Sequence, residues 1–136
     1  MDKSMLKIFK FYRYSMENFY KFDGRASRME VISFFVVYML TLFTASVITL
    51  IYSNFLNGNA DRFLLLWLIT AGITVLIHII PYISLCTRRL HDINVSGWLQ
   101  LIAYFVPMGS LILFIICSVV EGNTTRNDYG PKPGYY

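Results

Sequence analysis

Three long stretches without charged side chains constrain this chain more than any other feature. They cover residues 31–53, 63–87 and 98–120, and His78 is the only residue within them that gains a positive charge near neutral pH. Each stretch contains 23 to 25 residues, so a helix rising about 1.5 Å per residue would cross the roughly 30 Å hydrocarbon layer of a bilayer. We therefore predict three transmembrane helices at these residues.

A soluble protein with the same helices in its core is the alternative. The chain has 136 residues, of which 56% are hydrophobic and 15% are charged. A chain of this length cannot wrap three wholly apolar helices in polar cover. The sequence therefore predicts one all-helical membrane domain over residues 1–136, in which residues 1–30 form an arm and residues 121–136 form a polar tail.

Lysine and arginine residues gather in two segments. Seven of them precede residue 31, and Arg88 and Arg89 follow the second apolar run. The first connection contains only Arg62, and the tail contains Arg126 and Lys132. Basic segments resist translocation and stay in the cytoplasm. We therefore predict a multi-pass protein with a cytoplasmic N-terminus and a cytoplasmic connection between the second and third runs.

The arm has the spacing of an amphipathic helix, with apolar side chains on one face and polar side chains on the other. The apolar set is Met5, Ile8, Phe9, Tyr12, Met16, Phe19 and Tyr20, and the polar set is Lys3, Lys7, Lys10, Glu17 and Lys21. A basic helix of this kind lies in the headgroup plane with its aromatic side chains in the acyl boundary. We predict an interfacial helix that serves as an anchor, with a lipid or partner sensor as the alternative.

The residues before the first run carry a helix-start signal. Ser27 and Glu30 have capping-box spacing, in which each side chain accepts a hydrogen bond from the other residue's backbone NH. This cap would satisfy two donors that lipid cannot satisfy. It does not account for Arg25 or Arg28, which we predict to hold phosphates or to pair with Asp92.

Small and hydroxyl-bearing residues recur at multiples of four on the first two runs. They are Ser33, Thr41, Ala45, Thr49 and Ser53 on the first run, and Thr70, Thr74 and His78 on the second. Such faces let membrane helices approach closely, so we predict that the two faces meet. An ionisable residue within a membrane is commonly functional. His78 therefore supports an alternative function, a homo-oligomeric transporter or channel that uses this face, although no acidic residue in any run continues a proton relay.

The third run is interrupted at its midpoint by Pro107-Met108-Gly109-Ser110. It forms either one kinked span or a hairpin of two half-helices that re-enters and returns. The length of the run favours the span. The hairpin would also need its turn, at membrane depth, to be sheltered by protein. The basic residues of the tail favour the hairpin, which keeps them in the cytoplasm. We predict a third span broken at Pro107 and keep the re-entrant hairpin as the alternative.

Charged residues cluster between the second and third runs. A membrane stop needs only the two arginines there, so His91 and Asp92 require another explanation. An aspartate holds guanidinium groups in a fixed geometry, and a histidine titrates near neutral pH. We predict a cytoplasmic rim that binds anionic lipid headgroups or an acidic segment of a partner protein. The predicted rim consists of Arg25, Arg28, Arg88, Arg89, His91 and Asp92.

Catalysis is a further alternative. An enzyme acting on a lipid phosphate would use His91 and Asp92, but the sequence identifies neither a nucleophile nor a metal partner for them. It contains no zinc-ligand spacing, Walker loop, GxGxxG motif or aromatic RNA-binding signature. We therefore predict a protein that is not an enzyme and that has no cofactor, metal or nucleic-acid partner. Its predicted partners are membrane lipids, another protein or further copies of itself.

Three segments carry a family resemblance: FDGRASRMEV before the first run, RRLHDINVSGW after the second, and NDYGPKP in the tail. From about Phe22 to Pro133 the chain resembles the bacterial small inner-membrane family known as domain of unknown function 805, the YhaH-like proteins. The resemblance implies a bacterial inner-membrane protein of a few helices without an established biochemical activity, and it carries over no catalytic residue. Besides the rim, the signature positions are Ser27, Glu30, Gly97, Trp98, Asn127, Tyr129 and Gly130.

The tail block bears on the path of the third run. In a three-span chain NDYGPKP would lie on the outer side of the membrane, away from the other two blocks. In the hairpin alternative all three blocks would meet at the cytoplasmic face. If the blocks form one site, the hairpin is favoured.

Overall fold

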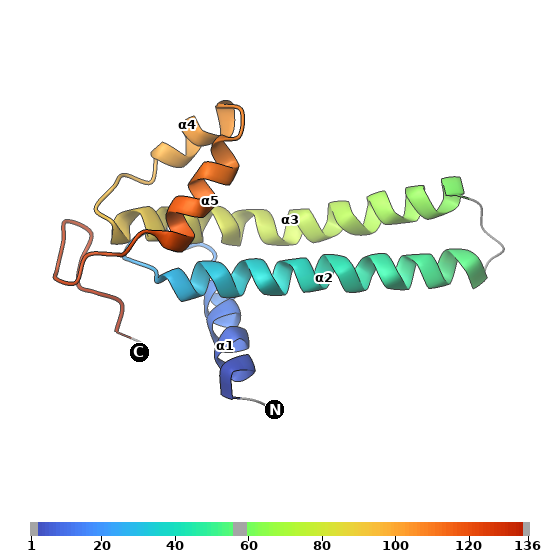
Figure 1. Cartoon of the computed structure of the whole chain (residues 1–136), viewed down its shortest axis with the longest axis horizontal. Helices are drawn as coiled ribbons and strands as arrows, with labels where there is room; N and C mark the ends of the chain where they lie inside the picture. Colours follow the sequence, from blue (N-terminus) through green and yellow to red (C-terminus); the bar gives the residue numbers. More distant parts are fainter. Residues whose placement is uncertain (1–2, 56–59, 135–136) are drawn as a thin grey trace.

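The computed structural model describes residues 3–55 and 60–134, so the outermost two residues of the predicted arm and of the predicted tail lie outside it. The described part is all-helical, with α1 (Lys3–Glu17), α2 (Arg28–Phe55), α3 (Ala60–Asp92), α4 (Leu99–Phe105) and α5 (Gly109–Val119). Figure 1 shows α2 and α3 side by side as a long antiparallel rod, with the other helices near one end. We call this the clustered end, and the opposite end the far end.

The two helices of the rod are the longest in the described chain. α2 has 28 residues and α3 has 33, and both are long and apolar enough to cross a membrane by length and composition. They contain the predicted runs 31–53 and 63–87. Large apolar side chains such as Phe43, Ile48 and Leu76 remain exposed on their outer faces. Such surfaces suit an apolar surrounding rather than water.

The small-residue faces predicted on the first two runs meet inside the rod. Ser33, Thr49, Thr74 and His78 are buried, and the hydroxyl oxygens of Thr49 and Thr70 lie 3.4 Å apart. Small side chains let apolar helices approach closely enough for dispersion contacts and hydrogen bonds between them. The predicted pairing of the two faces is confirmed.

Local signals at the clustered end determine where α2 begins and α3 ends. The NH of Ser27 donates to Glu30 Oε1 over 2.7 Å, and the NH of Glu30 donates to Ser27 Oγ over 3.3 Å, so the predicted capping box is confirmed. α3 continues through residues 88–92, which were predicted to form part of a connection. That prediction is wrong, because no glycine or proline lies between Pro81 and Asn94. The helix ends only before Asn94, which adopts a left-handed conformation with φ 60°.

α1 lies across the rod near the clustered end (Figure 1). The hydroxyl of Tyr12 lies 2.8 Å from His78 Nε2, and its ring centroid lies 5.6 Å from that of Phe34. Ile8 and Met16 are also half-buried. The remaining members of the predicted apolar face are exposed, namely Met5, Phe9, Phe19 and Tyr20. The face predicted to lie in lipid is therefore split, because part of it fastens α1 to α2 and α3.

The third apolar run does not form one kinked helix. It folds into α4 and α5, which lie against each other as a hairpin (Figure 1). Val106, before Pro107, is extended with φ −95° and ψ 133°, and Met108 turns the chain with φ 61°. A Cβ at Gly109 would lie 2.0 Å from the carbonyl oxygen of Ala103, so the close approach requires glycine. The break at Pro107 is confirmed, but the single helix is wrong and the hairpin describes the fold.

The hydrophobic core lies at the clustered end, where α2, α3 and α5 meet. Its buried members are Ala26, Val31, Phe34, Leu85, Leu90, Leu113 and Cys117. Because the hairpin reverses the chain, the tail returns to the same end as the segment that leads into α2 (Figure 1). The charged segments at the ends of the apolar runs therefore converge there.

Candidate functional site

Asp92 lies at the centre of a buried group of charges, the arginine cluster, which consists of Arg25, Glu30, Arg88, Arg89 and Asp92. Asp92 Oδ1 accepts a hydrogen bond of 2.8 Å from Arg25 Nε, and its Oδ2 accepts one from Arg89 Nη1. Arg89 is fully buried, and Arg25 and Asp92 are 6% and 5% exposed. One of the two roles predicted for Arg25, pairing with Asp92, is confirmed.

The remaining donors of Arg25 reach the tail. Its Nη1 donates to the carbonyl oxygens of Thr125 at 2.7 Å and Gly130 at 3.2 Å, and its Nη2 donates to that of Asn123. A guanidinium group presents its donors in a rigid fork, so one side chain fixes several carbonyl groups in place. Arg25 thereby ties the tail to the segment before α2.

Arg89 ties the end of α5 to α3. Its Nε donates to the carbonyl oxygen of Cys117 at 2.9 Å, and its Nη2 donates to that of Val120. Carbonyl groups in the last turn of a helix lack intrahelical donors, and the helix dipole there favours a cation. Arg25 and Arg89 therefore hold the tail and the hairpin around the same carboxylate.

The tail approaches Asp92 so closely that position 122 requires glycine. A Cβ at Gly122 would lie 1.8 Å from Asp92 Oδ2. The NH of the next residue, Asn123, donates to the backbone carbonyl of Asp92 at 2.8 Å. Sequence reasoning missed both residues, because no local pattern in the tail signals contact with the end of an earlier helix.

Arg88 occupies the other side of the cluster, next to Glu30. Its side chain is 4% exposed, and its Nη1 lies 3.7 Å from Glu30 Oε2. Its Nε and Nη2 make no hydrogen bond to any described residue, while its backbone carbonyl accepts one of 3.0 Å from Ala26. Glu30 thus has two roles, because one oxygen caps α2 and the other compensates a buried cation.

Arg28 differs from the other three arginines of the predicted rim. Its side chain is 44% exposed, and its Nη2 lies 3.2 Å from Glu121 Oε1. With Lys132 it lines a cavity of about 320 Å³. The prediction of an open rim of four arginines is wrong, because Asp92 and Glu30 draw the other guanidinium groups into the protein. A binding role for the rim residues stays a prediction.

His91 is not paired with Asp92. Its Nδ1 lies 3.2 Å from the carbonyl oxygen of Gly24, and its ring stacks on that of Tyr129 with centroids 3.8 Å apart and an interplanar angle of 6°. Both carboxylate oxygens of Asp92 are bonded to guanidinium groups, and the two side chains line separate cavities. His91 and Asp92 therefore do not form an acid–base pair in this conformation.

The tail block NDYG forms a tight turn against His91. Asn127 and Gly130 exchange two backbone hydrogen bonds of 3.1 Å, and Gly130 has φ 123°. Asn127 Oδ1 accepts from the NH of Tyr129 at 3.0 Å, and Asn127 Nδ2 donates to the carbonyl of His91 at 2.8 Å. The turn thus stacks Tyr129 on His91 and brings the third signature block onto α3.

The connection after α3 packs back on that helix. A Cβ at Gly97 would lie 2.5 Å from Thr87 Cγ2, and Gln100 Nε2 donates to Thr87 Oγ1 at 2.6 Å. Trp98 is 76% exposed. Gly97 therefore permits the close contact, and Trp98 faces outward, as an indole at a membrane interface would. All three signature blocks thus meet at the clustered end.

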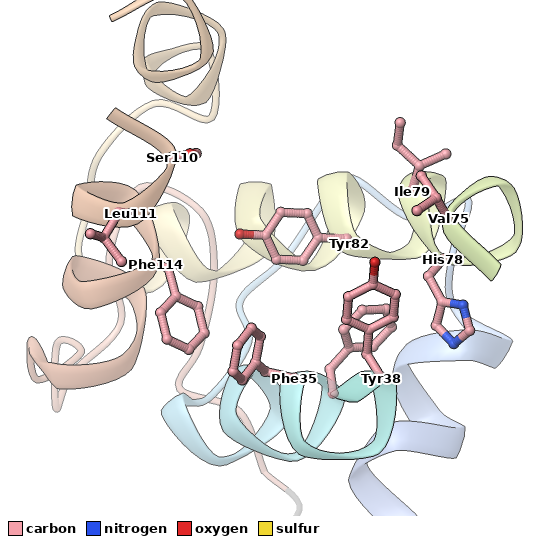
Figure 2. Close-up of a pocket in the computed structure, with 10 residues that line it drawn as sticks. Phe35, Tyr38, Val75, His78, Ile79, Tyr82, Ser110, Leu111 and Phe114 are labelled. Carbon is pink, nitrogen blue, oxygen red and sulfur yellow. The ribbon is translucent and has the colours of Figure 1, made fainter. Parts of the chain in front are cut away.

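His78 lies deeper in the rod, beside a half-open cavity of about 440 Å³ (Figure 2). Its Nδ1 lies 2.8 Å from the carbonyl oxygen of Thr74, and its Nε2 lies 2.8 Å from the Tyr12 hydroxyl. Because a carbonyl only accepts, Nδ1 donates to Thr74, and Nε2 is bonded to the Tyr12 hydroxyl. No sequence pattern indicated this cavity, which forms between three helices.

Metal ligands do not gather at either place. Among residues 3–55 and 60–134, no group of three or more His, Cys, Asp or Glu side chains is arranged to hold a metal ion. Cys86 and Cys117 are buried and free.

Comparisons with known proteins cover most of the chain. A family model described as protein of unknown function, DUF805, matches residues 19–131. Inner membrane protein YhaI of Escherichia coli strain K12 is 28% identical over 120 residues, which cover 88% of this chain and 92% of that protein. Inner membrane protein YhaH of the same strain is 28% identical over 118 residues, covering 87% and 91%. No solved structure matches the chain.

Proposed function

This chain belongs to the family of proteins of unknown function DUF805, as its signature blocks predicted, and on that premise we propose that it is an inner-membrane protein. In this proposal α2 and α3 cross the bilayer, and the hairpin of α4 and α5 enters from the cytoplasmic side and returns to it. The clustered end lies in the cytoplasm. YhaI and YhaH are named as inner membrane proteins, which supports this location.

The bonds between the tail and the arginine cluster support this topology most strongly. Arg25 bonds to Asp92 of α3 and to Thr125 and Gly130 of the tail. These segments must therefore share one side of any membrane that the rod crosses. Eleven of the twelve lysine and arginine residues belong to the arm, the end of α3 or the tail, and only Arg62 belongs to the far end. Basic segments stay in the cytoplasm.

Thiol labelling from the two sides of the membrane tests the topology. We expect Arg126→Cys to react with a membrane-impermeant maleimide in inverted vesicles but not in intact spheroplasts. Ala60→Cys at the far end is the matched control and should react only in spheroplasts. Cys86 and Cys117 are buried and should add little background. Labelling of Arg126→Cys in intact spheroplasts would overturn the proposed topology.

At the cytoplasmic surface the protein binds anionic lipid headgroups through α1, without catalysis. Lys7, Lys10 and Arg13 are exposed on this helix, beside exposed apolar side chains such as Leu6 and Phe9. A helix with both kinds of surface lies at the boundary between headgroups and acyl chains. Each exposed cation gains about 1 kcal/mol from an anionic membrane surface.

The arginine cluster supports this function indirectly. The guanidinium groups of Arg25 and Arg89 are already bonded to a carboxylate and to backbone carbonyls. They therefore hold the segments of the clustered end together instead of capturing a headgroup. Arg28, which is exposed, adds a cation to the binding surface.

Lipid retained by the purified protein tests the binding proposal. Full-length protein is reconstituted with phosphatidylcholine and phosphatidylglycerol, extracted in detergent, and its retained lipid is quantified by mass spectrometry. We expect the variant with Lys7→Gln, Lys10→Gln and Arg13→Gln to retain roughly a hundredfold less phosphatidylglycerol, because it loses about 1 kcal/mol for each of three surface cations. Arg62→Gln at the far end is the matched control. Unchanged retention in the triple variant would contradict the proposal, and loss of a co-purifying protein instead of lipid would favour a protein partner.

Two alternative functions depend on other residues. A homo-oligomeric transporter or channel centred on His78 would need that ring to exchange a proton or bind a ligand, whereas both its nitrogens are bonded within the chain. An enzyme acting on a lipid phosphate would need His91 and Asp92 to act together, whereas they lie in separate environments. Flux that His78→Ala abolishes in proteoliposomes would support the first alternative, and turnover of a lipid phosphate would support the second.

A further inference from the structure

The cavity beside His78 has the size and lining of a ligand site. It has a volume of about 440 Å³ and lies between α2, α3 and α5 (Figure 2). Small-molecule pockets typically enclose about 300 to 1,000 Å³, with apolar walls and few polar groups. The rings of Phe35 and Phe114 close one side with centroids 4.5 Å apart, and Val75 and Ile79 contribute to another.

Few polar groups face this cavity. The nitrogens of His78 are bonded to Thr74 and to Tyr12, so they are not available to an occupant. The hydroxyl of Tyr38 makes no hydrogen bond to any described residue, and Figure 2 shows it pointing from α2 towards α3. A hydroxyl in apolar surroundings gains free energy from an acceptor. Ser110 and Tyr82 also line the cavity with hydroxyl groups. The cavity therefore suits a largely apolar molecule that carries an acceptor for the Tyr38 hydroxyl.

The position of the cavity along the rod indicates which molecule this is. Phe34 and Tyr38 follow Arg28 by six and ten residues, which corresponds to roughly 9 and 15 Å along a helix. With Arg28 at the level of the headgroups, the cavity lies just below them, at the start of the acyl chains. The outer face of α2 at this level exposes large apolar side chains such as Val36 and Met39. The surrounding medium at this depth is hydrocarbon rather than water.

We propose that this cavity holds one acyl chain of a diacyl phospholipid from the cytoplasmic leaflet, whose ester carbonyl accepts a hydrogen bond from the Tyr38 hydroxyl. The inference rests on the proposed crossing of the membrane by α2 and α3. It is independent of headgroup binding by α1, because it concerns the chain and the ester rather than the charge of the lipid.

The walls of the cavity also contact α1. Phe34 and His78 line the cavity. The ring of Phe34 packs against that of Tyr12 in α1, and His78 Nε2 is bonded to the Tyr12 hydroxyl. An acyl chain in the cavity therefore presses on the two side chains that fasten α1 to the rod. Occupancy of the cavity strengthens the docking of α1.

Photolabelling from within the bilayer tests the inference. Full-length protein is reconstituted in vesicles of phosphatidylcholine that include a diester phosphatidylcholine with a diazirine on its acyl chain, and labelled residues are mapped by mass spectrometry. We expect labels on Phe35 and Phe114. Ser110→Phe places a ring in the cavity and should lower this labelling roughly tenfold, because the filled pocket excludes the chain. Ile112→Phe, on the exposed face of α5, is the matched control and should label like the wild type.

A second variant tests the ester contact without changing the shape of the cavity. Tyr38→Phe should lower labelling by the diester probe roughly threefold, as expected for loss of one hydrogen bond. Labelling by a diether probe, which lacks the carbonyl, should already be low in the wild type and should not fall further in Tyr38→Phe. Equal labelling of the wild type by both probes would overturn the Tyr38 contact. If the Ser110→Phe variant elutes as a folded protein and is labelled as strongly as the wild type, the cavity is not the site.

The same probe separates this inference from the proposed function. The variant with Lys7→Gln, Lys10→Gln and Arg13→Gln should still label normally at Phe35 and Phe114, because the phosphatidylcholine probe is neutral. Normal labelling together with unchanged phosphatidylglycerol retention would support the cavity and overturn headgroup binding by α1. Absence of any acyl label on α2 and α3 would overturn the membrane crossing and the cavity proposal together.

Discussion

At the far end of the rod α2 and α3 meet through small hydroxyl-bearing side chains, whereas at the clustered end buried charges join α3 to the hairpin, the tail and the segment before α2. The far end has contacts such as that between Thr49 and Thr70 at 3.4 Å, and hydrogen bonds between membrane helices average about 0.6 kcal/mol. At the clustered end Asp92 compensates both Arg25 and Arg89. Removing one partner of a buried ion pair costs about 3–5 kcal/mol, so the free energy of unfolding depends mainly on the clustered end.

The largest effect is expected when the carboxylate at the centre of the arginine cluster is removed. Asp92→Asn leaves the guanidinium groups of Arg25 and Arg89 buried without their counter-charge, which should lower the free energy of unfolding by about 3–5 kcal/mol. Thermal unfolding of the detergent-solubilised protein, followed by circular dichroism, measures this. Asp61→Asn, on the exposed first turn of α3 at the far end, is the matched control. Equal loss of stability in the two variants would contradict the difference between the ends.

A methyl group added to the tail gives the next largest effect. Gly122→Ala places a Cβ 1.8 Å from Asp92 Oδ2, so the tail must shift, and we expect a loss of about 1–3 kcal/mol. Gly72→Ala in α3 is the control, because a Cβ there meets nothing within 4 Å. It should be neutral or stabilising, since alanine favours helix by up to about 1 kcal/mol over glycine. The same thermal unfolding experiment compares the two, and tolerance of Gly122→Ala would show that the tail is not held against Asp92.

Loss of the helix cap should have an intermediate effect. Ser27→Ala removes the oxygen that accepts from the NH of Glu30, and cap residues of this kind contribute about 1 kcal/mol. Thr44→Ala is the control, because the Thr44 hydroxyl is exposed and bonds only to carbonyls of its own helix. Its effect should stay within about 0.5 kcal/mol. Urea titration in detergent measures both variants, and a larger loss for Thr44→Ala would contradict the assigned role of the cap.

The smallest effect is expected at the far end. Thr49→Ala removes the hydroxyl that lies 3.4 Å from that of Thr70, and we expect a loss of about 0.6 kcal/mol. The double variant with Thr70→Ala should lose little more, because the two hydroxyl groups share one contact. Thermal unfolding of the two single variants and the double variant measures this coupling. A loss at Thr49 as large as that of Asp92→Asn would remove the distinction between the two ends.

Local rules were enough to predict the rod. The apolar runs 31–53 and 63–87 predicted α2 and α3, because the length and composition of a membrane-spanning helix depend on its own residues alone. The capping box of Ser27 and Glu30 was predictable for the same reason, since both partners lie within one turn of α2. The pairing of hydroxyl-bearing faces needed only the helical period, which places every fourth residue on one side.

Contacts between distant segments were not predictable in the same way. Length favoured one span over residues 98–120, but the hairpin depends on the approach of Gly109 to Ala103 and on the tail carbonyls that Arg25 binds. The arginines were predicted to bind headgroups or a partner, and basic side chains beside a span commonly reach towards headgroups. Burial of Arg25 requires acceptors from the tail, and burial of Arg89 requires acceptors at the end of α5. The cavity beside His78 likewise exists only once α5 has packed near α2 and α3.

The partners of Arg25 determine when the clustered end can form during synthesis. Its acceptor Thr125 lies 100 residues later in the sequence, and Gly130 follows later still. Before the tail is made, this guanidinium has Asp92 as a partner but lacks the carbonyl acceptors of Asn123, Thr125 and Gly130. The hydrogen bonds that join the clustered end to the tail therefore form only after the tail has been synthesised. A chain that ends before residue 121 would lack these three acceptors, so fewer bonds would hold the segment before α2 at the clustered end.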